Sequence, residues 1–510
     1  MERKWWTLLV VCISIFMLLL DITVVNVALP VIQRDLGADF SHLQWVVDAY
    51  ALTLAGLLLT AGSLADRYGR RLIFAGGLVL FVAASLLCGF STTPTMLDLA
   101  RGLQGIGGAA MFATSLALLA QEFEGRERAT AFGIWGATTG LAVAIGPLVG
   151  GALVDGIGWE WIFFVNVPIG ALCTWIAVTK VRETRDPSQG GVDLLGVITF
   201  STALLCLVFA LIRGNSEGWG SALIVSLLVV SGLMLAAFVA VERRVANPMF
   251  DLSLFRKPTF TGASIVAFCL SASMFAMFLY VTLYMQNVLD FTALETGLRF
   301  LPLSLLSFFA AAISGRLSER VPVRYFMAGG LLLVAGGLLL MHGVSVDSKW
   351  TTLLGGFILS GTGIGLINPP LASTAIGVVR PQQSGMASGI NTTFRQVGIA
   401  TGIAALGAIF QARVESKLSE LPLPRQAASR VQELAEAIAS GGSKQAIGNA
   451  PPQARGQITE AANQAFVAGF NTILLVGVAI AVVGAISALA LVRQRDFVAA
   501  GAPEGAPAGA

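Results

Sequence analysis

The sequence predicts an all-α protein that crosses a membrane many times. Of its 510 residues, 55% are apolar and only 12% are charged, whereas a soluble domain carries about 25% charged residues. Apolar runs of about 20 residues recur along the chain, and runs of that length span a bilayer as helices rather than as barrel strands. The five cysteines all fall within apolar runs, which indicates buried side chains rather than disulfides or a metal site.

The apolar runs divide the chain into fourteen predicted spans. We predict a six-helix bundle in 1–185, two additional helices with linkers in 186–255, and a second six-helix bundle in 256–495. The tail 496–510 is rich in Ala, Gly and Pro and is predicted to be disordered. The spans lie at roughly 7–31, 43–64, 72–91, 96–119, 129–153, 162–180, 193–212, 220–241, 260–288, 294–315, 325–343, 351–378, 385–410 and 466–492.

Basic residues predict the orientation of these spans. Most arginines and lysines outside the spans fall on the side of the N-terminus, while the short loops opposite hold little more than Arg34, Arg213 and Lys349. Loops rich in Lys and Arg stay in the cytoplasm. With an even number of spans, both termini are therefore expected there.

One loop, 411–465, is far longer than the others. Within it, Gln426–Ala439 carries apolar residues at helical spacing, which predicts a short amphipathic helix that ends at Gly441 and Gly442. The segment is either a solvated excursion or a lid or docking surface at the outer mouth.

The loops after spans 2 and 10 resemble each other. The first reads GSLADRYGRR (Gly62–Arg71) and the second GRLSERVPVR (Gly315–Arg324). The correspondence indicates two homologous halves around a central site, as in transporters. In the first copy, Asp66 can face a helix N-terminus or pair with Arg70, and either contact would latch two helices in one state. The candidate latch residues are Gly62, Asp66, Arg67, Gly69 and Arg70.

Two carboxylates and one guanidinium lie inside predicted spans near the N-terminus. Asp21 lies in span 1, Asp48 about two turns into span 2, and Arg101 in span 4. Charges at such positions are costly and usually functional. Two acids at similar depth that face one apolar cavity could exchange protons at physiological pH. The alternatives are a structural buried pair for Asp21, a locally paired surface acid for Asp48, and an Arg101 that reaches the outer interface, with Asp98 as its partner.

Span 5 carries small residues in a stripe with a proline. Such a stripe forms a packing face and a hinge. Its members are Gly140, Gly146, Pro147, Gly150 and Gly151.

Several of these motifs resemble those of one transporter family. Gly62–Arg71 resembles the signature GxLaDrxGrkxxl of the major facilitator superfamily, although in the second copy Glu319 and Pro322 depart from it. The span-5 stripe resembles the gxxxGPxxGG motif of the superfamily's antiporters. LDITVVNVALP in span 1 and WVVDAYAL in span 2 resemble segments of its fourteen-span drug:H⁺ antiporters and quaternary-ammonium exporters. RGLQGIGGA (Arg101–Ala109) resembles the family's span-4 motif. The resemblance implies the major facilitator fold, proton transfer involving Arg101, and export by exchange.

The second half offers fewer charged candidates. NTTFRQVG in span 13 resembles a segment of the same family and places Arg395 inside the membrane, where it needs an acid or carbonyl partner. Spans 11–14 contain no acid, and Glu295, near the start of span 10, is the only acidic candidate in the second half. The scarcity of acids in these spans disfavours export of divalent cations and favours monovalent substrates. Soft and aromatic side chains on span 9 are candidates for a cavity wall, although lipid-facing helices look similar. The further substrate candidates are Met274, Phe275, Phe278, Tyr280 and Asn391.

Together, these features predict a proton-coupled antiporter of the inner (cytoplasmic) membrane that exports lipophilic, monovalent cationic drugs, antiseptics and dyes. Its partners would be these substrates, protons and membrane lipid. We expect a monomer with no enzymatic activity, cofactor, metal or nucleic-acid partner, driven by the proton gradient. The alternatives are an exporter of an endogenous lipid, siderophore or metabolite, a proton-coupled importer, and a receptor that has lost transport.

Overall fold

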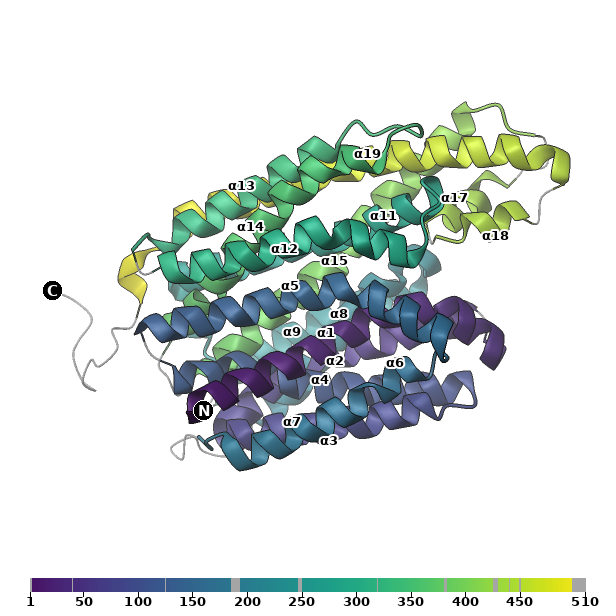
Figure 1. Cartoon of the computed structure of the whole chain (residues 1–510). Coiled ribbons are helices and arrows are strands. Elements are labelled where there is room, and N and C mark those ends of the chain that lie inside the picture. Colours follow the sequence, from purple (N-terminus) through teal and green to yellow (C-terminus); the bar gives the residue numbers. More distant parts are fainter. Residues whose placement is uncertain are drawn as a thin grey trace.

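The computed structural model is built from long helices that run roughly alongside one another (Figure 1). It describes residues 2–38, 40–123, 125–184, 193–245, 250–318, 320–379, 383–424, 430–439, 441–448 and 451–497. Thirteen helices in this part of the chain are long and apolar enough to cross a membrane. The fifth predicted span corresponds to a further helix, α5, of 32 residues. The predicted all-α polytopic fold is confirmed.

The first half and the additional pair comprise α1 (Arg3–Leu36), α2 (Phe40–Tyr68), α3 (Arg70–Gly89), α4 (Pro94–Glu122), α5 (Gly125–Gly156), α6 (Trp161–Phe164), α7 (Asn166–Lys180), α8 (Leu194–Glu217) and α9 (Ala222–Glu242). The rest comprises η1 (Leu252–Arg256), α10 (Pro258–Leu270), η2 (Ser271–Phe275), α11 (Ala276–Leu283), η3 (Tyr284–Val288), α12 (Ala293–Leu317), α13 (Val323–Met341), η4 (Trp350–Leu353), α14 (Leu354–Gly377), α15 (Ser384–Glu420), α17 (Val431–Ala439), α18 (Ser443–Gly448), α19 (Pro452–Leu491) and η6 (Gln494–Asp496).

Helix ends follow the local sequence. Thr93 caps α4 by accepting a hydrogen bond from the Met96 amide, and Pro94 occupies the first turn, where its missing N–H costs nothing. Gly37 ends α1 in the left-handed conformation, with φ 61°, which glycine adopts without steric cost.

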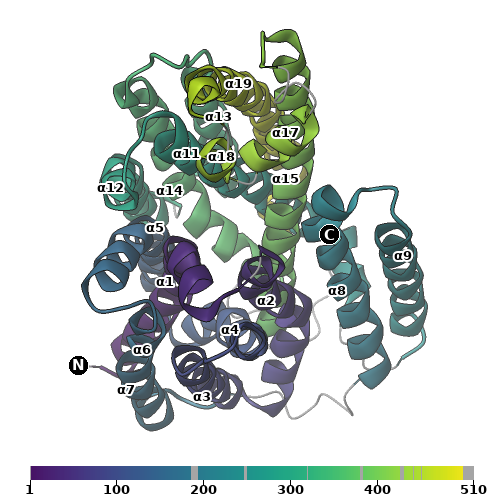
Figure 2. The same cartoon turned by 90° about the vertical axis from the view of Figure 1, so that its right-hand side faces the viewer.

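Two large apolar clusters form the interior. One consists mainly of residues from α1 to α7, and the other of residues from α10 to α19. The additional helices α8 and α9 lie at one side of the bundle (Figure 2). There α8 packs against α2 and α15, and a third apolar cluster fills the contact. Two six-helix bundles with an added pair agree with this packing, while the domain boundaries themselves stay predictions.

The two halves meet along α5 and α12 and along α2 and α15. The close approaches involve glycines of α5. A Cβ added to Gly136 would lie 3.3 Å from Asn368 Cβ, and one on Gly140 would lie 3.2 Å from Ser307 Oγ. Gly136 and Gly140 therefore allow α5 to approach α14 and α12 of the other half closely.

The long loop 411–465 is largely helical. α15 continues to Glu420 and α19 begins at Pro452, so both extend beyond the predicted spans (Figure 1). The predicted amphipathic helix is present as α17, with Leu434, Ala435 and Ile438 buried. It packs on α15, so the segment is a folded extension of the second half rather than a fully solvated loop.

Span 9 is not a regular α-helix. The predicted span 260–288 is interrupted by two π-helical segments, η2 and η3. Such wide turns are rare and are often found at functional sites.

The start of the predicted tail is ordered: Asp496 accepts hydrogen bonds from the backbone and hydroxyl of Thr259 at 3.2 and 2.6 Å. Residues 498–510 lie outside the described part of the chain.

Candidate functional site

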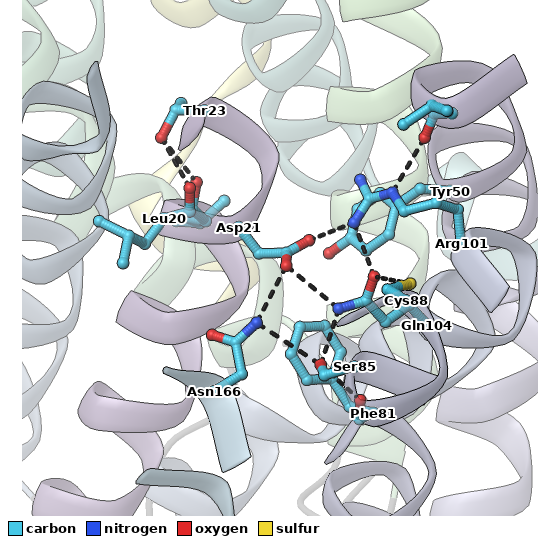
Figure 3. A network of polar contacts seen from close by, with 12 residues as sticks. Leu20, Asp21, Thr23, Tyr50, Phe81, Ser85, Cys88, Arg101, Gln104 and Asn166 are labelled. Carbon is cyan, nitrogen blue, oxygen red and sulfur yellow. Dashed lines mark hydrogen bonds and ion pairs between the residues drawn. The ribbon is translucent and has the colours of Figure 1, made fainter. Parts of the chain in front are cut away.

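A buried ion pair between α1 and α4 is the centre of the candidate site (Figure 3). Arg101 Nη1 lies 2.5 Å from Asp21 Oδ2. The two residues are only 1% and 2% exposed. Arg101 therefore does not reach the outer interface. Its predicted partner Asp98 contacts His42 instead, with 2.6 Å between Asp98 Oδ2 and His42 Nδ1. Although Asp98 precedes Arg101 by only three residues on α4, the carboxylate that contacts Arg101 is Asp21 of α1.

Amide side chains complete the surroundings of Asp21. Gln104 Nε2 and Asn166 Nδ2 donate to Asp21 Oδ1 at 3.1 and 3.0 Å. Gln104 Nε2 also donates to Ser85 Oγ at 2.8 Å, and its Oε1 accepts from Arg101 at 2.7 Å. One carboxylate thereby links α1, α4 and α7, with α3 contributing Ser85. Because hydrogen bonds to a buried charge must be replaced when the charge changes, this network ties four helices to the state of Asp21.

Close helix packing brings Arg101 to this position. A Cβ on Gly105 would collide with Thr53 Oγ1 and with the Tyr50 carbonyl of α2, so α2 and α4 can approach this closely only because of this glycine. Arg101 Nε then donates to the Val46 carbonyl at 2.9 Å. The guanidinium carbon lies 4.3 Å from the ring centroid of Tyr50, which is cation–π geometry.

Asp48 is not part of this network. It lies 4.0 Å from Arg213 Nε of α8, with side chains 16% and 9% exposed. Leu52, four residues after Asp48 and therefore on the same face of α2, packs against the apolar cluster that α2 shares with α8. The face of α2 that carries Asp48 therefore points toward α8. The structure therefore turns Asp48 toward the additional helices rather than toward Asp21. It also places Arg213 inside α8, which corrects our assignment of this arginine to a loop.

The latch loop connects the two halves. Arg70 Nε and Nη2 donate to Asp66 Oδ1 at 3.0 and 2.9 Å. Asp66 Oδ2 accepts from the backbone amide of Met386 at 2.8 Å. Met386 lies in the first turn of α15, where amides lack helical partners and favour an anion. Both alternatives that the sequence left open for Asp66 are therefore present in one state.

The remaining latch candidates have packing positions. Gly69 has φ 124°, and a Cβ there would lie 2.6 Å from the Glu183 carboxylate. Gly62 is buried in α2 and Arg67 is half-buried. Glu319 of the second copy lies outside the described residues.

The stripe of α5 has two packing partners. Gly140 faces α12 of the other half, while a Cβ on Gly146 would collide with Thr23 Oγ1 of α1. Gly150 is also tight, since its Cβ would lie 3.2 Å from the Val24 carbonyl, whereas Gly151 has open space within 4 Å. The side chain of Pro147 lies outside the described residues.

Arg395 and Glu295 have different surroundings in the second half. Arg395 Nη2 donates to Asn368 Oδ1 of α14 at 3.0 Å, so its partner is the carbonyl oxygen of an amide. Glu295 caps α12, where its Oε2 accepts from the Thr292 amide at 2.9 Å. A capping box explains this acid without a membrane role.

The candidates on span 9 mostly pack inside the second half. Met274 and Tyr280 are 2% and 3% exposed within its apolar cluster, and the Tyr280 ring lies 5.0 Å from that of Phe410. Phe278 packs on the same cluster with its ring 5.6 Å from Phe300. The Phe275 side chain lies outside the described residues. Asn391 of α15 is 2% exposed.

Asn166 and Arg213 were missed as site residues in the sequence. Asn166 stands in the apolar run IFFVNVP, and a lone amide there is a signal that could have been followed. Arg213 is close to the end of an apolar run, where charges are common. Within the described ranges, no three His, Cys, Asp or Glu side chains are placed to hold a metal ion.

Comparison with known proteins assigns the family. The sequence profile of the Major Facilitator Superfamily matches residues 11–403. The chain belongs to this superfamily. It is accordingly a multi-pass membrane transporter and not an enzyme.

Relatives and a solved structure agree with this assignment. The chain is 39% identical to a puromycin resistance protein of Streptomyces alboniger over 80% of its length and 82% of the relative. It is 36% identical to the multidrug resistance protein Stp of Mycobacterium tuberculosis, covering 93% and 89% of the two chains. The human organic anion transporter MFSD10 has the same fold, with a TM-score of 0.61, 14% identity, and 94% and 100% of the two chains covered.

Proposed function

We propose that this superfamily member is a proton-coupled antiporter that exports lipophilic drugs by alternating access. One observation carries the proposal: Asp21, a carboxylate buried in the middle of α1, contacts a buried arginine and two amides from two other helices. A proton that binds this carboxylate removes its charge and weakens the contact with Arg101. The names of the puromycin and multidrug resistance relatives support drug export.

The latch supports the conformational part of the proposal. Asp66 joins α2 of one half to the start of α15 of the other, on the side of the predicted spans whose loops are rich in Arg and Lys. We infer that this side is cytoplasmic, that both termini lie there, and that the membrane is the inner one. The half-to-half contacts would then close the cytoplasmic side, and their release would open it.

The preference for cationic drugs stays a prediction. A substrate cation could neutralise Asp21 or Asp48 only by replacing an arginine, because Arg101 and Arg213 lie beside these two carboxylates. We also propose that one chain suffices, that protons, lipid and drugs are the partners, and that the proton gradient replaces a cofactor.

The proposal is tested by efflux of a dye such as ethidium from proteoliposomes with and without a pH gradient. The wild type should need the gradient, and Asp21→Asn should lose gradient-driven efflux by about tenfold or more, as expected when a proton-transfer group is removed. Asp347→Asn changes an exposed acid outside the helices and should leave efflux unchanged. Gradient-driven efflux at the wild-type rate in Asp21→Asn would refute the coupling role.

A further inference from the structure

Three aspartates of the helices, Asp21 and Asp66, which are buried, and Asp48, which is partly buried, each have an arginine nearby. Asp21 contacts Arg101, Asp66 contacts Arg70 at 2.9 Å, and Asp48 lies 4.0 Å from Arg213. Each pair is neutral, so the three acids contribute no net negative charge to the membrane interior. This arrangement gives little attraction to a substrate cation.

Arg395 differs from these arginines. Among the described residues it has no carboxylate partner, and its contact is the amide oxygen of Asn368 at 3.0 Å. It lies eleven residues into α15, about 16 Å along the helix axis. Its side chain is nevertheless half-buried rather than enclosed. A guanidinium exposed to lipid at this depth would be costly, so the exposed part should face a watery path or a bound molecule.

The position of Asn368 locates Arg395 at the junction of the two halves. Asn368 Cβ packs against Gly136 of α5, one turn before the stripe. Its side-chain oxygen faces Arg395 on α15, so the pair borders the surface on which the halves meet. This is where alternating access exposes a substrate first to one side and then to the other.

A second hydrogen-bond donor next to Arg395 lacks an acceptor. Asn391 precedes Arg395 by one helical turn on α15, and its buried Nδ2 has no acceptor among the described residues. Trp135 of α5 also has a buried Nε1 with no acceptor in the described part of the chain, but its ring packs on Phe112 of α4 inside the first half and is not part of this group. Buried donors without acceptors are uncommon and call for an explanation. A ligand with oxygen acceptors would provide one.

We propose that Arg395, with Asn391 one turn away, binds the acidic or phenolic oxygen of a lipophilic substrate. The preferred substrates would then be lipophilic organic acids and phenols rather than simple cations. Asn368 acts as a positioning residue that holds the guanidinium. This inference rests on the proposed export function and names its substrate class.

The test compares two dyes that differ in one group, a rhodamine ester and its free carboxylic acid. Transport of both is measured in proteoliposomes with a pH gradient. Arg395→Gln should lower transport of the acid by about tenfold or more, the loss expected for a charge-assisted hydrogen bond, and should change that of the ester little. Arg395→Lys keeps the charge but loses the forked geometry, so it should retain part of the activity toward the acid.

The control is Arg430→Gln, an equal charge change at an exposed arginine near α17, which should alter neither dye. Equal losses of both dyes in Arg395→Gln, or no loss, would overturn the inference. If Arg395→Gln does not fold, Arg395→Lys and Asn391→Leu must still reduce the acid selectively. A wild type that moves only the ester refutes the acid site alone, whereas a wild type that moves neither dye overturns the export proposal as well.

Discussion

Asp21 is costly to bury and is compensated by three side chains from two neighbouring helices. A carboxylate in the middle of a span has an insertion penalty of about 2.5–3.5 kcal/mol. Arg101, Gln104 and Asn166 supply a countercharge and donors to both of its oxygens. The network is therefore both the source of stability for the charge and the route by which a change at Asp21 reaches α4 and α7.

Asn166 gives a prediction at the scale of single residues. Asn166→Leu removes one donor to Asp21 Oδ1 and should lower the free energy of unfolding by about 1–3 kcal/mol, because a buried charged acceptor loses a partner. Thermal melting in detergent measures the loss. In an Asp21→Asn background the effect of Asn166→Leu should shrink, since the two residues act on one contact. Losses that simply add would show that Asn166 does not act through Asp21.

At the scale of the helices, the apolar runs predicted the spans well. They did not predict that some helices continue beyond the spans, because the sequence there is polar. α15 continues through QARVESKLSE to Glu420, where the apolar run ends but Ala, Glu and Lys still favour a helix. The direction in which Asp48 points was not predictable, because α2 is apolar on several faces. Which face meets α8 depends on packing between segments distant in sequence.

For the α5 stripe, we predict that replacing Gly146 by alanine destabilises the protein more than the same change at Gly151. Gly146→Ala places a Cβ against Thr23 of α1 and should cost about 1–3 kcal/mol through overpacking. Gly151→Ala meets open space and should be neutral or gain up to about 1 kcal/mol in helix propensity. Melting temperature and dye efflux of the two variants measure the difference. Equal effects of the two changes would contradict the packing described for α1 and α5.

For the whole molecule, the halves meet along two helix pairs, α5 with α12 and α2 with α15, and the Asp66 contact joins the second of these pairs. The sequence predicted Asp66 as a latch that pairs with Arg70 or faces a helix N-terminus, but not which helix, because Met386 contributes a backbone amide from 320 residues away. Because every residue except proline carries a backbone amide, the pattern of side chains does not predict which amide will be the partner. Arg101 and Asp21 were likewise selected separately, and only the packing of α1 on α4 shows that they form one pair.

The latch gives a prediction about the conformational equilibrium. Asp66→Asn loses the Arg70 ion pair and weakens the contact with α15, so the end closed by the latch should open more often. A cysteine in place of the buried Ala387, in an otherwise cysteine-free protein, should react faster with a polar maleimide. Asp347→Asn is the matched control, because it makes the same change at an exposed acid outside the helices, and it should leave the labelling rate unchanged. Unchanged labelling in Asp66→Asn would contradict the latch role.

Proton exchange at Asp21 is the central claim, and proton release on drug binding tests it most directly. Purified protein in weakly buffered detergent solution with a pH-sensitive dye should release protons when a transported drug is added, and Asp21→Asn should release few or none while still binding the drug. Proton release of wild-type size from Asp21→Asn would contradict the claim.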